Sequence, residues 1–115
     1  MEKISTNFTL EEFYKSYTAD SLNINNAPND KIKKNIYKLV TEVLQPIRDS
    51  YGKPIIVSSG YRCEKLNKAV GGANNSDHKF GCAADIHTVS DKPEDNKVLF
   101  DTICALAKSG KIKCR

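Results

Sequence analysis

The 115-residue sequence contains no tryptophan, a single methionine and no apolar run that approaches the roughly 18–20 residues needed to span a bilayer. Residues 1–7 also lack the apolar stretch of a signal peptide. The sequence therefore predicts neither a transmembrane helix nor a leader. Three explanations stay open: the protein acts where it is made, a separate device exports it, or the chain is an excised piece of a longer protein.

Neither sign of charge dominates, because 18 Lys and Arg residues face 14 Asp and Glu residues, for a formal net charge of +4. The densest basic cluster, Lys31, Lys33 and Lys34, falls short of the basic stripe with interleaved aromatics that a nucleic-acid binder shows. We expect no nucleic-acid partner, no membrane partner and a monomeric chain. The mild positive charge suits an anionic polymer such as a bacterial cell wall.

The sequence also lacks any Cys-x-x-Cys spacing, which removes the signature of a zinc knuckle or a redox motif. Its four cysteines allow three disulfide pairings, and spacing does not choose among them. Without an export signal, we expect buried free thiols. A disulfide-stabilised secreted protein without an active site is the alternative. The cysteines are Cys63, Cys82, Cys104 and Cys114.

Capping residues and apolar spacing predict two helices in the first half of the chain. Thr9 and Glu12 have the spacing of a capping box, which predicts a short helix over residues 9–17. Residues 21–29 hold four asparagines and one proline, which predicts a loop. Residues 30–51 carry an apolar stripe at steps of three and four, which predicts a long helix. The stripe comprises Ile32, Ile36, Leu39, Val40, Val43, Leu44 and Ile47.

Proline and glycine divide the middle of the chain. Pro46 is expected to kink the long helix, and Gly52 is expected to end it. Residues 54–59 are rich in β-branched side chains and predict a buried strand. Residues 62–70 then predict a short helix, and residues 71–75 predict a flexible loop with strong turn chemistry.

The last part of the chain predicts a strand over residues 82–88 and a final helix. Asp91 is expected to cap this helix, Pro93 to occupy an early position in it and Gly110 to end it. Its expected buried face comprises Val98, Leu99, Ile103, Leu106 and Ala107. Helices and strands without regular βαβ alternation predict an α+β fold, in a single domain over residues 1–115.

The densest cluster of candidate site residues lies between positions 58 and 85. His78 ends a loop, and Asp85 lies among alanine and isoleucine in a predicted strand. An ionised carboxylate buried there needs a partner. A divalent cation shared with the imidazole is one such partner, and zinc accepts both ligand types. On spacing alone, a hydrogen-bonded pair or two unrelated polar residues is the simpler explanation.

An ordered set of motifs covers most of the chain. It begins with Phe8-Thr9-Leu10-Glu11-Glu12-Phe13, Thr18-Ala19, Ile24-x-Asn26-x-Pro28, Leu44-x-Pro46-Ile47-Arg48 and Tyr51-Gly52-Lys53-Pro54. It continues with Ser59-Gly60-Tyr61-Arg62, Asn67, Gly71-Gly72 and Ser76-x-His78-x-x-Gly81-x-Ala83-x-Asp85. Together these motifs resemble the zinc D-alanyl-D-alanine carboxypeptidase and dipeptidase family, whose fold is shared by the hedgehog signalling domain.

The resemblance implies an α+β fold with a small antiparallel sheet and helices packed on it. It also implies zinc-dependent hydrolysis of peptide bonds in bacterial cell-wall peptides that contain D-amino acids. His78 and Asp85 match two of the three zinc ligands of this family. Arg62 matches the arginine that holds substrate and stabilises the oxyanion. Ser76 matches a hydroxyl that binds substrate or orients the site.

These roles have simpler alternatives. Arg62 is an ordinary surface arginine if it pairs with Glu64, and Ser76 is a turn cap if it only closes the turn before His78. Tyr61 is expected in the core. Two further residues are expected to organise a loop and to close the wall of the cleft, namely Asn67 and Phe80.

The chain departs from the family pattern after Asp85. The third zinc ligand of the family is a later histidine, and its general base lies close to that histidine. This chain stops at Arg115 before either residue, and the only histidine after Asp85 is His87. One explanation is a fragment whose missing tail holds both residues. The other is a naturally short protein that is inactive or uses His87, which shares a strand face with Asp85.

Two functions follow from this comparison. The first is a zinc metallopeptidase that cuts peptidoglycan peptides, although the 115-residue chain alone is expected to be a poor catalyst. The second is a non-catalytic peptidoglycan-binding module with the same fold. A phage lysis enzyme that a separate pore-forming protein releases fits a chain without a leader.

Overall fold

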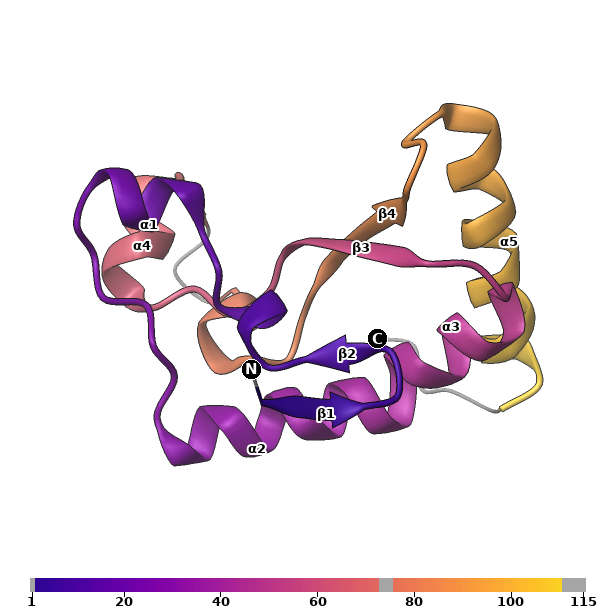
Figure 1. Ribbon diagram of the computed structural model, residues 1–115, viewed down its shortest axis with the longest axis horizontal. Helices are drawn as coiled ribbons and strands as arrows, with labels where there is room; N and C mark the ends of the chain where they lie inside the picture. Colours follow the sequence, from indigo (N-terminus) through magenta and orange to yellow (C-terminus); the bar gives the residue numbers. More distant parts are fainter. Residues whose placement is uncertain (1, 73–75, 111–115) are drawn as a thin grey trace.

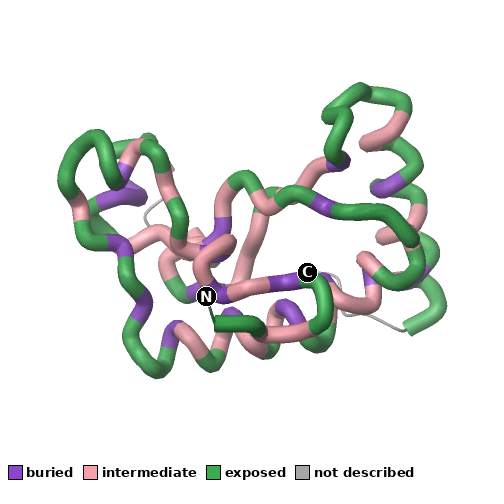
Figure 2. The backbone as a smooth tube through the Cα atoms, viewed as in Figure 1, coloured by how far each residue is buried: buried purple, intermediate pink, exposed green. Residues whose placement is uncertain are grey.

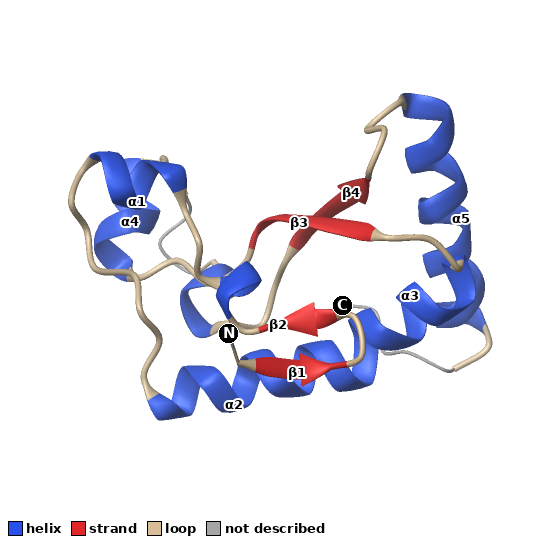
Figure 3. Ribbon diagram, viewed as in Figure 1, coloured by secondary structure: helices blue, strands red, loops and turns tan. Residues whose placement is uncertain are grey.

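The computed structural model describes residues 2–72 and 76–110, in which helices surround two short antiparallel strand pairs (Figures 1 and 3). The first pair joins β1 (Lys3–Ser5) to β2 (Phe8–Thr9). The second joins β3 (Ile55–Ser59) to β4 (Asp85–Thr88), two strands that are far apart in the sequence. The predicted α+β fold, with helices packed on small antiparallel sheets, is confirmed.

The longest helical stretch forms as predicted between residues 30 and 51. It consists of α2 (Asp30–Leu39), a π-helical turn η2 (Val40–Leu44) and α3 (Gln45–Tyr51). The π turn immediately precedes Pro46, which has no N–H to donate to the preceding turn. The helix therefore accommodates the proline by widening one turn.

Both ends of this stretch have capping groups. The side chain of Asn29 accepts a hydrogen bond from the Ile32 backbone N–H at 2.9 Å. At the other end, Gly52 has a φ of +78°, and its N–H donates to the Arg48 carbonyl at 2.9 Å. The predicted stop at Gly52 is confirmed.

The strands β3 and β4 have an inner face and an outer face. Ile55 and Thr88 are paired and buried, at 7% and 3% exposure, on the inner face. Ile56 pairs with His87 on the outer face and is 40% exposed. The expectation of a fully buried strand is therefore wrong: side chains alternate because only one face of this pair meets the core.

The core lies where the inner face of the sheet, the β1–β2 pair and the long helical stretch meet, and Figure 2 shows buried segments along these elements. The final helix α5 (Pro93–Lys108) packs against α3 and β4. The short helices α1 (Tyr17–Ser21) and α4 (Glu64–Ala69) lie side by side at the other end of the molecule (Figure 1). The largest fully buried apolar side chains are Phe8, Phe13, Ile36, Val40 and Leu66.

The single helix predicted over residues 9–17 does not form. A short 3-10 helix, η1 (Glu11–Phe13), follows β2, and α1 begins only after Ser16, whose hydroxyl accepts from the Ala19 N–H at 3.1 Å. The capping contact exists, because the Thr9 N–H donates to Glu12 at 2.6 Å. Tyr17, the first residue of α1, is 87% exposed, so burial of this side chain does not support one continuous helix.

The start of α5 also differs from the prediction. Asp91 does not cap the helix; it has a φ of +54°, and its carboxylate accepts a hydrogen bond from the Asn96 side chain at 2.8 Å. Aspartate tolerates this left-handed conformation because its short side chain can hydrogen-bond locally. Lys92 precedes Pro93 at the helix start, and Val98 is 55% exposed rather than buried. Leu99 and Leu106 occupy the buried face as expected.

The remaining predictions are mostly confirmed. The helix expected over residues 62–70 forms as α4, and Gly110 follows α5 with a φ of +78°. The second strand begins at Asp85 rather than at Cys82. Of the loop at 71–75, only Gly71 and Gly72 lie within the described residues.

The described cysteines are free thiols, as expected, but they are half-buried rather than buried. They are Cys63, Cys82 and Cys104, and Cys114 lies outside the described residues. Within residues 2–72 and 76–110, no helix combines the length and the hydrophobicity needed to cross a membrane.

One buried asparagine ties the amino-terminal segment to the middle of the chain. Asn26 is 6% exposed, and its side-chain NH₂ donates to the carbonyls of Tyr14 and Tyr61 at 2.9 and 3.0 Å. Its side-chain oxygen accepts from the Cys63 N–H at 2.8 Å. The three backbone groups belong to two irregular segments, where no strand or helix provides a hydrogen-bond partner. Asn26 supplies that partner.

We expect Asn26→Ala to lower the free energy of unfolding by about 3 kcal/mol, because three backbone groups lose their partner. Urea denaturation followed by circular dichroism measures this loss. Asn25→Ala is the matched control: Asn25 is exposed and makes one local bond, to the Ala27 N–H at 3.0 Å. Equal losses for the two variants would contradict the bridging role of Asn26.

Candidate functional site

The structure brings together the two residues that the sequence singled out as metal ligands. His78 lies in the 3-10 helix η3 (Asp77–Phe80), and Asp85 is the first residue of β4. Nε2 of His78 is 3.6 Å from Oδ2 of Asp85. The imidazole side chain is 12% exposed and the carboxylate side chain is 65% exposed. The expectation that Asp85 is buried within an apolar strand is therefore wrong, because the strand starts at Asp85, on its outer face.

A backbone carbonyl fixes the imidazole of His78. Nδ1 lies 2.6 Å from the carbonyl oxygen of Gly60. Because a carbonyl oxygen can only accept, Nδ1 carries the proton in this bond, and Nε2 of a neutral ring keeps its lone pair. The lone pair is therefore free on the nitrogen that lies nearest the Asp85 carboxylate.

The backbone around His78 is held by two further hydrogen bonds. The His78 N–H donates to the Ser76 hydroxyl at 3.2 Å, and the His78 carbonyl accepts from the Arg62 N–H at 2.9 Å. Gly81 follows with a φ of +73°, and a Cβ there would lie 2.9 Å from a side-chain carbon of Ile36. The turn between His78 and β4 is thus closely packed on α2.

Gly60 occupies a position that no other residue fits. A Cβ at this position would lie 2.6 Å from the Phe13 carbonyl oxygen and 2.8 Å from the Phe13 Cα. The next residue, Tyr61, donates its N–H to the same carbonyl at 2.5 Å. The chain that leaves β3 therefore lies directly on the backbone of η1, which sets the position of the Gly60 carbonyl. The role of this carbonyl was not predicted, although Gly60 lies within one of the motifs.

A bulge in β3 shifts the pairing near the site. Val57 pairs with Ile86, but Ser59 rather than Ser58 pairs with Asp85. The extra residue, Ser58, donates its hydroxyl hydrogen to the Asp85 carbonyl at 3.1 Å. Bulges of this kind redirect side chains next to functional sites.

Arg62 and Ser76 approach each other beside the candidate ligands. Nη2 of Arg62 is 3.5 Å from the Ser76 hydroxyl, and Nε of Arg62 is buried without a hydrogen-bond partner among the described residues. The alternative ion pair between Arg62 and Glu64 does not form in the described part of the chain. Ser76 does cap the turn before His78, so the turn-cap role and the contact with Arg62 coexist.

His87 is not brought to the other two residues. Its Nδ1 lies 2.6 Å from the Thr88 carbonyl oxygen and 3.6 Å from a carboxylate oxygen of Asp91. Residues 2–72 and 76–110 hold no group of three His, Cys, Asp or Glu side chains placed to bind one metal ion. The hypothesis that His87 substitutes for a third ligand is therefore wrong: it shares a strand face with Asp85, but its ring is hydrogen-bonded elsewhere.

Two hollows lie near this region. One, of about 260 Å³, is lined by Arg62, Gly60 and Tyr61 together with residues 15–18, and neither His78 nor Asp85 lines it. Burial raises the pKa of the Tyr61 phenol, with a smaller contribution from the Cys63 sulfur, so this wall keeps a neutral hydroxyl. The amino-terminal contribution to this pocket was not predicted from the sequence.

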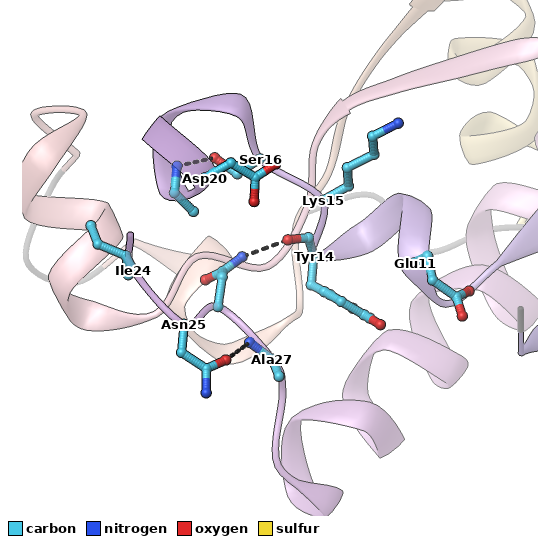
Figure 4. A pocket seen from close by; sticks show the side chains of 10 residues that line it. Glu11, Tyr14, Lys15, Ser16, Asp20, Ile24, Asn25 and Ala27 are labelled. Atoms are coloured by element: carbon cyan, nitrogen blue, oxygen red, sulfur yellow. Dashed lines mark hydrogen bonds between the residues drawn. The ribbon is translucent and has the colours of Figure 1, made fainter. Parts of the chain in front are cut away.

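The second hollow, of about 380 Å³, lies among residues 11–27 (Figure 4). Tyr14 and Asn26 form part of its wall. Phe80, expected to close the cleft, is 50% exposed and lines neither hollow; its carbonyl accepts from the Asn35 side chain at 2.8 Å. Asn67 is 2% exposed, and its carbonyl accepts from the Gly72 N–H at 2.8 Å, which agrees with a role in organising the loop.

A protein-family model matches the sequence over most of its length. A family model described as peptidase M15 matches residues 6–110. The chain is also 50% identical over 44 residues to the zinc D-Ala-D-Ala carboxypeptidase of Streptomyces albus G. That alignment covers 37% of this chain and 17% of the relative, so the match spans only a small part of the relative's length.

We expect Gly60→Ala to lower the free energy of unfolding by about 3 kcal/mol, because the methyl group collides with the backbone of Phe13. Gly52→Ala is the control, since the space around Gly52 is open and its φ of +78° is the only source of strain. That variant should lose about 1 kcal/mol. Thermal and urea denaturation measure both, and a loss at Gly60 no larger than at Gly52 would refute the packing argument.

Proposed function

Because the chain belongs to the peptidase M15 family, we propose that it binds zinc through His78 and Asp85 and acts on peptide bonds in bacterial cell-wall peptides that contain D-amino acids. One observation carries the proposal. Nε2 of His78 faces the Asp85 carboxylate at 3.6 Å, while Nδ1 is engaged by the Gly60 carbonyl at 2.6 Å. Metal-binding histidines commonly have this arrangement, in which the second ring nitrogen donates to a carbonyl.

The donor set suits zinc. Neutral imidazole nitrogen and carboxylate oxygen are both ordinary zinc ligands. The described residues supply two such ligands. The remaining positions, 1, 73–75 and 111–115, include no His, Asp or Glu, so the proposal leaves the third ligand and the general base unassigned in this sequence. The relative from Streptomyces albus G is itself named a zinc carboxypeptidase.

Each side chain of the site has a defined part in the proposed reaction. A zinc ion held by His78 and Asp85 would supply Lewis-acid polarisation of a scissile carbonyl and activation of a water molecule. His78 is held in one orientation by the Gly60 carbonyl, which removes the cost of ordering the ring. Arg62 places a fixed positive charge beside the site, where negative charge grows on oxygen in the transition state. Ser76 contacts the guanidinium at 3.5 Å and positions it.

The second candidate function is a wall-binding module that does not cut. The absence of a three-residue metal group among residues 2–72 and 76–110 favours it. In this case Arg62 and the pocket beside it hold a wall peptide, and no hydrolysis follows.

We expect His78→Ala to lower the affinity for zinc by about tenfold or more. Removing a residue that only hydrogen-bonds to a metal ligand already lowers metal affinity about 10–100-fold, and His78 is itself a proposed ligand. Isothermal titration of the reduced protein with zinc chloride measures the affinity. His87→Ala is the matched control, because that ring bonds to Thr88 and pairs with Asp91 away from the site. The free thiols contribute equally in both variants. Unchanged affinity in His78→Ala would rule out the proposed metal site.

We expect the zinc-loaded 115-residue chain to release new amino groups from purified peptidoglycan only slowly, because it has no assigned third ligand or general base, and we expect a chelator to stop the release. Arg62→Ala should lower kcat/KM about 10²–10³-fold because a preorganised charge is lost. Arg48→Ala in α3 is the control arginine. Sedimentation with insoluble peptidoglycan separates the two functions: binding without release supports the wall-binding module, and neither binding nor release contradicts both.

A further inference from the structure

The pocket beside Arg62 includes a second cation, Lys15, that the proposed reaction does not use. Its lining includes two cations, Lys15 and Arg62, and no Asp or Glu among the described residues. Hydroxyl groups add further polar atoms to the same wall. They belong to Ser16, Tyr17, Thr18, Ser58, Ser59 and Tyr61.

We infer that Lys15 is a specificity-determining residue that selects wall peptides with a carboxylate, which it binds together with Arg62 in this pocket. The inference rests on the proposed function and names the substrate group that the site recognises. The two cations come from segments far apart in the sequence, because Lys15 precedes α1 and Arg62 follows β3. An anion between them meets two positive charges and no repelling carboxylate.

Lys15 is free to make this contact. Its side chain is exposed, and its ammonium has neither a hydrogen bond nor an ion pair to any residue of the described chain. Figure 4 shows it extending away from Asn25 and Ala27 on the other side of the neighbouring hollow. Its backbone is nevertheless anchored, because the Lys15 N–H donates to the Glu11 carbonyl at 2.9 Å.

The other polar atoms of the pocket divide into engaged and available donors. Ser58 already donates to the Asp85 carbonyl, and the Ser16 hydroxyl accepts from the Ala19 N–H. The hydroxyls of Thr18 and Ser59 have no hydrogen-bond partner within residues 2–72 and 76–110, so they can donate to a carboxylate oxygen. Each of these available groups can donate a hydrogen bond, as an acceptor-only carboxylate requires.

Size and apolar surface narrow the ligand further. The pocket volume of about 260 Å³ lies just below the roughly 300–1,000 Å³ of drug-sized ligand sites. Leu66 and Val70 add an apolar surface to the lining. The lining thus combines cations, hydroxyl donors and a small apolar surface.

The pocket adjoins the candidate metal ligands. Gly60 lines it and also holds His78 through its carbonyl, and Ser59 lines it and pairs with Asp85 across the sheet. A peptide anchored there by its carboxylate therefore lies next to the His78–Asp85 pair. The carboxylate belongs either to the carboxyl terminus of the peptide or to an internal acidic residue.

The test is a binding experiment on the full chain with chelator present, so that no hydrolysis occurs. NMR titration compares N-acetyl-D-Ala-D-Ala with its carboxyl-terminal amide. A second probe, N-acetyl-D-glutamyl-D-alaninamide, carries only an internal carboxylate. We expect at least one carboxylate probe to bind about tenfold more tightly than the neutral amide, as for a charge-assisted hydrogen bond. The carboxylate probe that binds more tightly shows whether the pocket recognises a terminal or an internal carboxylate.

Variants at position 15 isolate the lysine. Lys15→Ala should reduce the ratio of the affinity for the carboxylate probe to the affinity for the neutral amide to about threefold or less. Lys15→Glu should reduce this ratio below one, because like charges repel. Lys15→Arg should keep most of it. Lys108→Ala is the matched control, since Lys108 is exposed at the end of α5, and it should leave the ratio unchanged. Circular dichroism confirms that each variant is folded.

Equal binding of acid and amide, or an unchanged ratio in Lys15→Ala, overturns the inference. Those results leave the proposed hydrolysis intact if wall peptides are still cut. The opposite result is also informative. If Lys15 distinguishes the acid from the amide but no amino groups are released from peptidoglycan, the binding role of the pocket is supported and the peptidase proposal is refuted.

Discussion

The hydrogen bond between the Gly60 carbonyl and Nδ1 of His78, at 2.6 Å, is the contact on which the site depends. It fixes which ring nitrogen carries the proton and which one faces Asp85. Its position is set by the core, because Gly60 lies against the backbone of Phe13 with no room for a Cβ. Phe13 is itself 1% exposed. The close packing of the Gly60 and Phe13 backbones therefore determines the orientation of the His78 imidazole.

The segments around the site are irregular, and hydrogen bonds rather than periodic packing hold them. Asn26 bridges three backbone groups, and the Arg62 N–H bonds the His78 carbonyl at 2.9 Å. An isolated two-stranded pair is marginally stable in water. The β3–β4 pair is supported because α5 packs beside it and its inner face contacts the core. The site therefore lies where a well-packed sheet face ends and a hydrogen-bonded loop begins.

The sequence predicted those elements in which buried residues recur at a regular spacing. The stripe over residues 30–51 and the β-branched run before Ser59 formed helix and strand, because periodic burial decides both. The helix expected over 9–17 did not form as one element, and Tyr17 at the start of α1 is exposed.

The candidate ligands were found through the motif that contains them, since the spacing of His78 and Asp85 alone favoured a simpler explanation. The exposure of Asp85 and the bulge at Ser58 depend on contacts between distant segments. No local pattern encodes those contacts. The contribution of Lys15 to the pocket likewise depends on how α1 and β3 meet.

The unequal exposure of the two candidate ligands indicates the kind of metal site that this arrangement supports. Structural zinc sites are closed on all sides, whereas catalytic sites keep an open position. Here the His78 ring is 12% exposed and anchored, while the Asp85 carboxylate is 65% exposed on the outer face of the sheet. The fold also has a hydrophobic core of its own, built on residues such as Phe8, Ile36 and Val40, so metal is not needed to assemble it. A metal ion held by this pair would face solvent and an incoming peptide, with the positively charged pocket beside it.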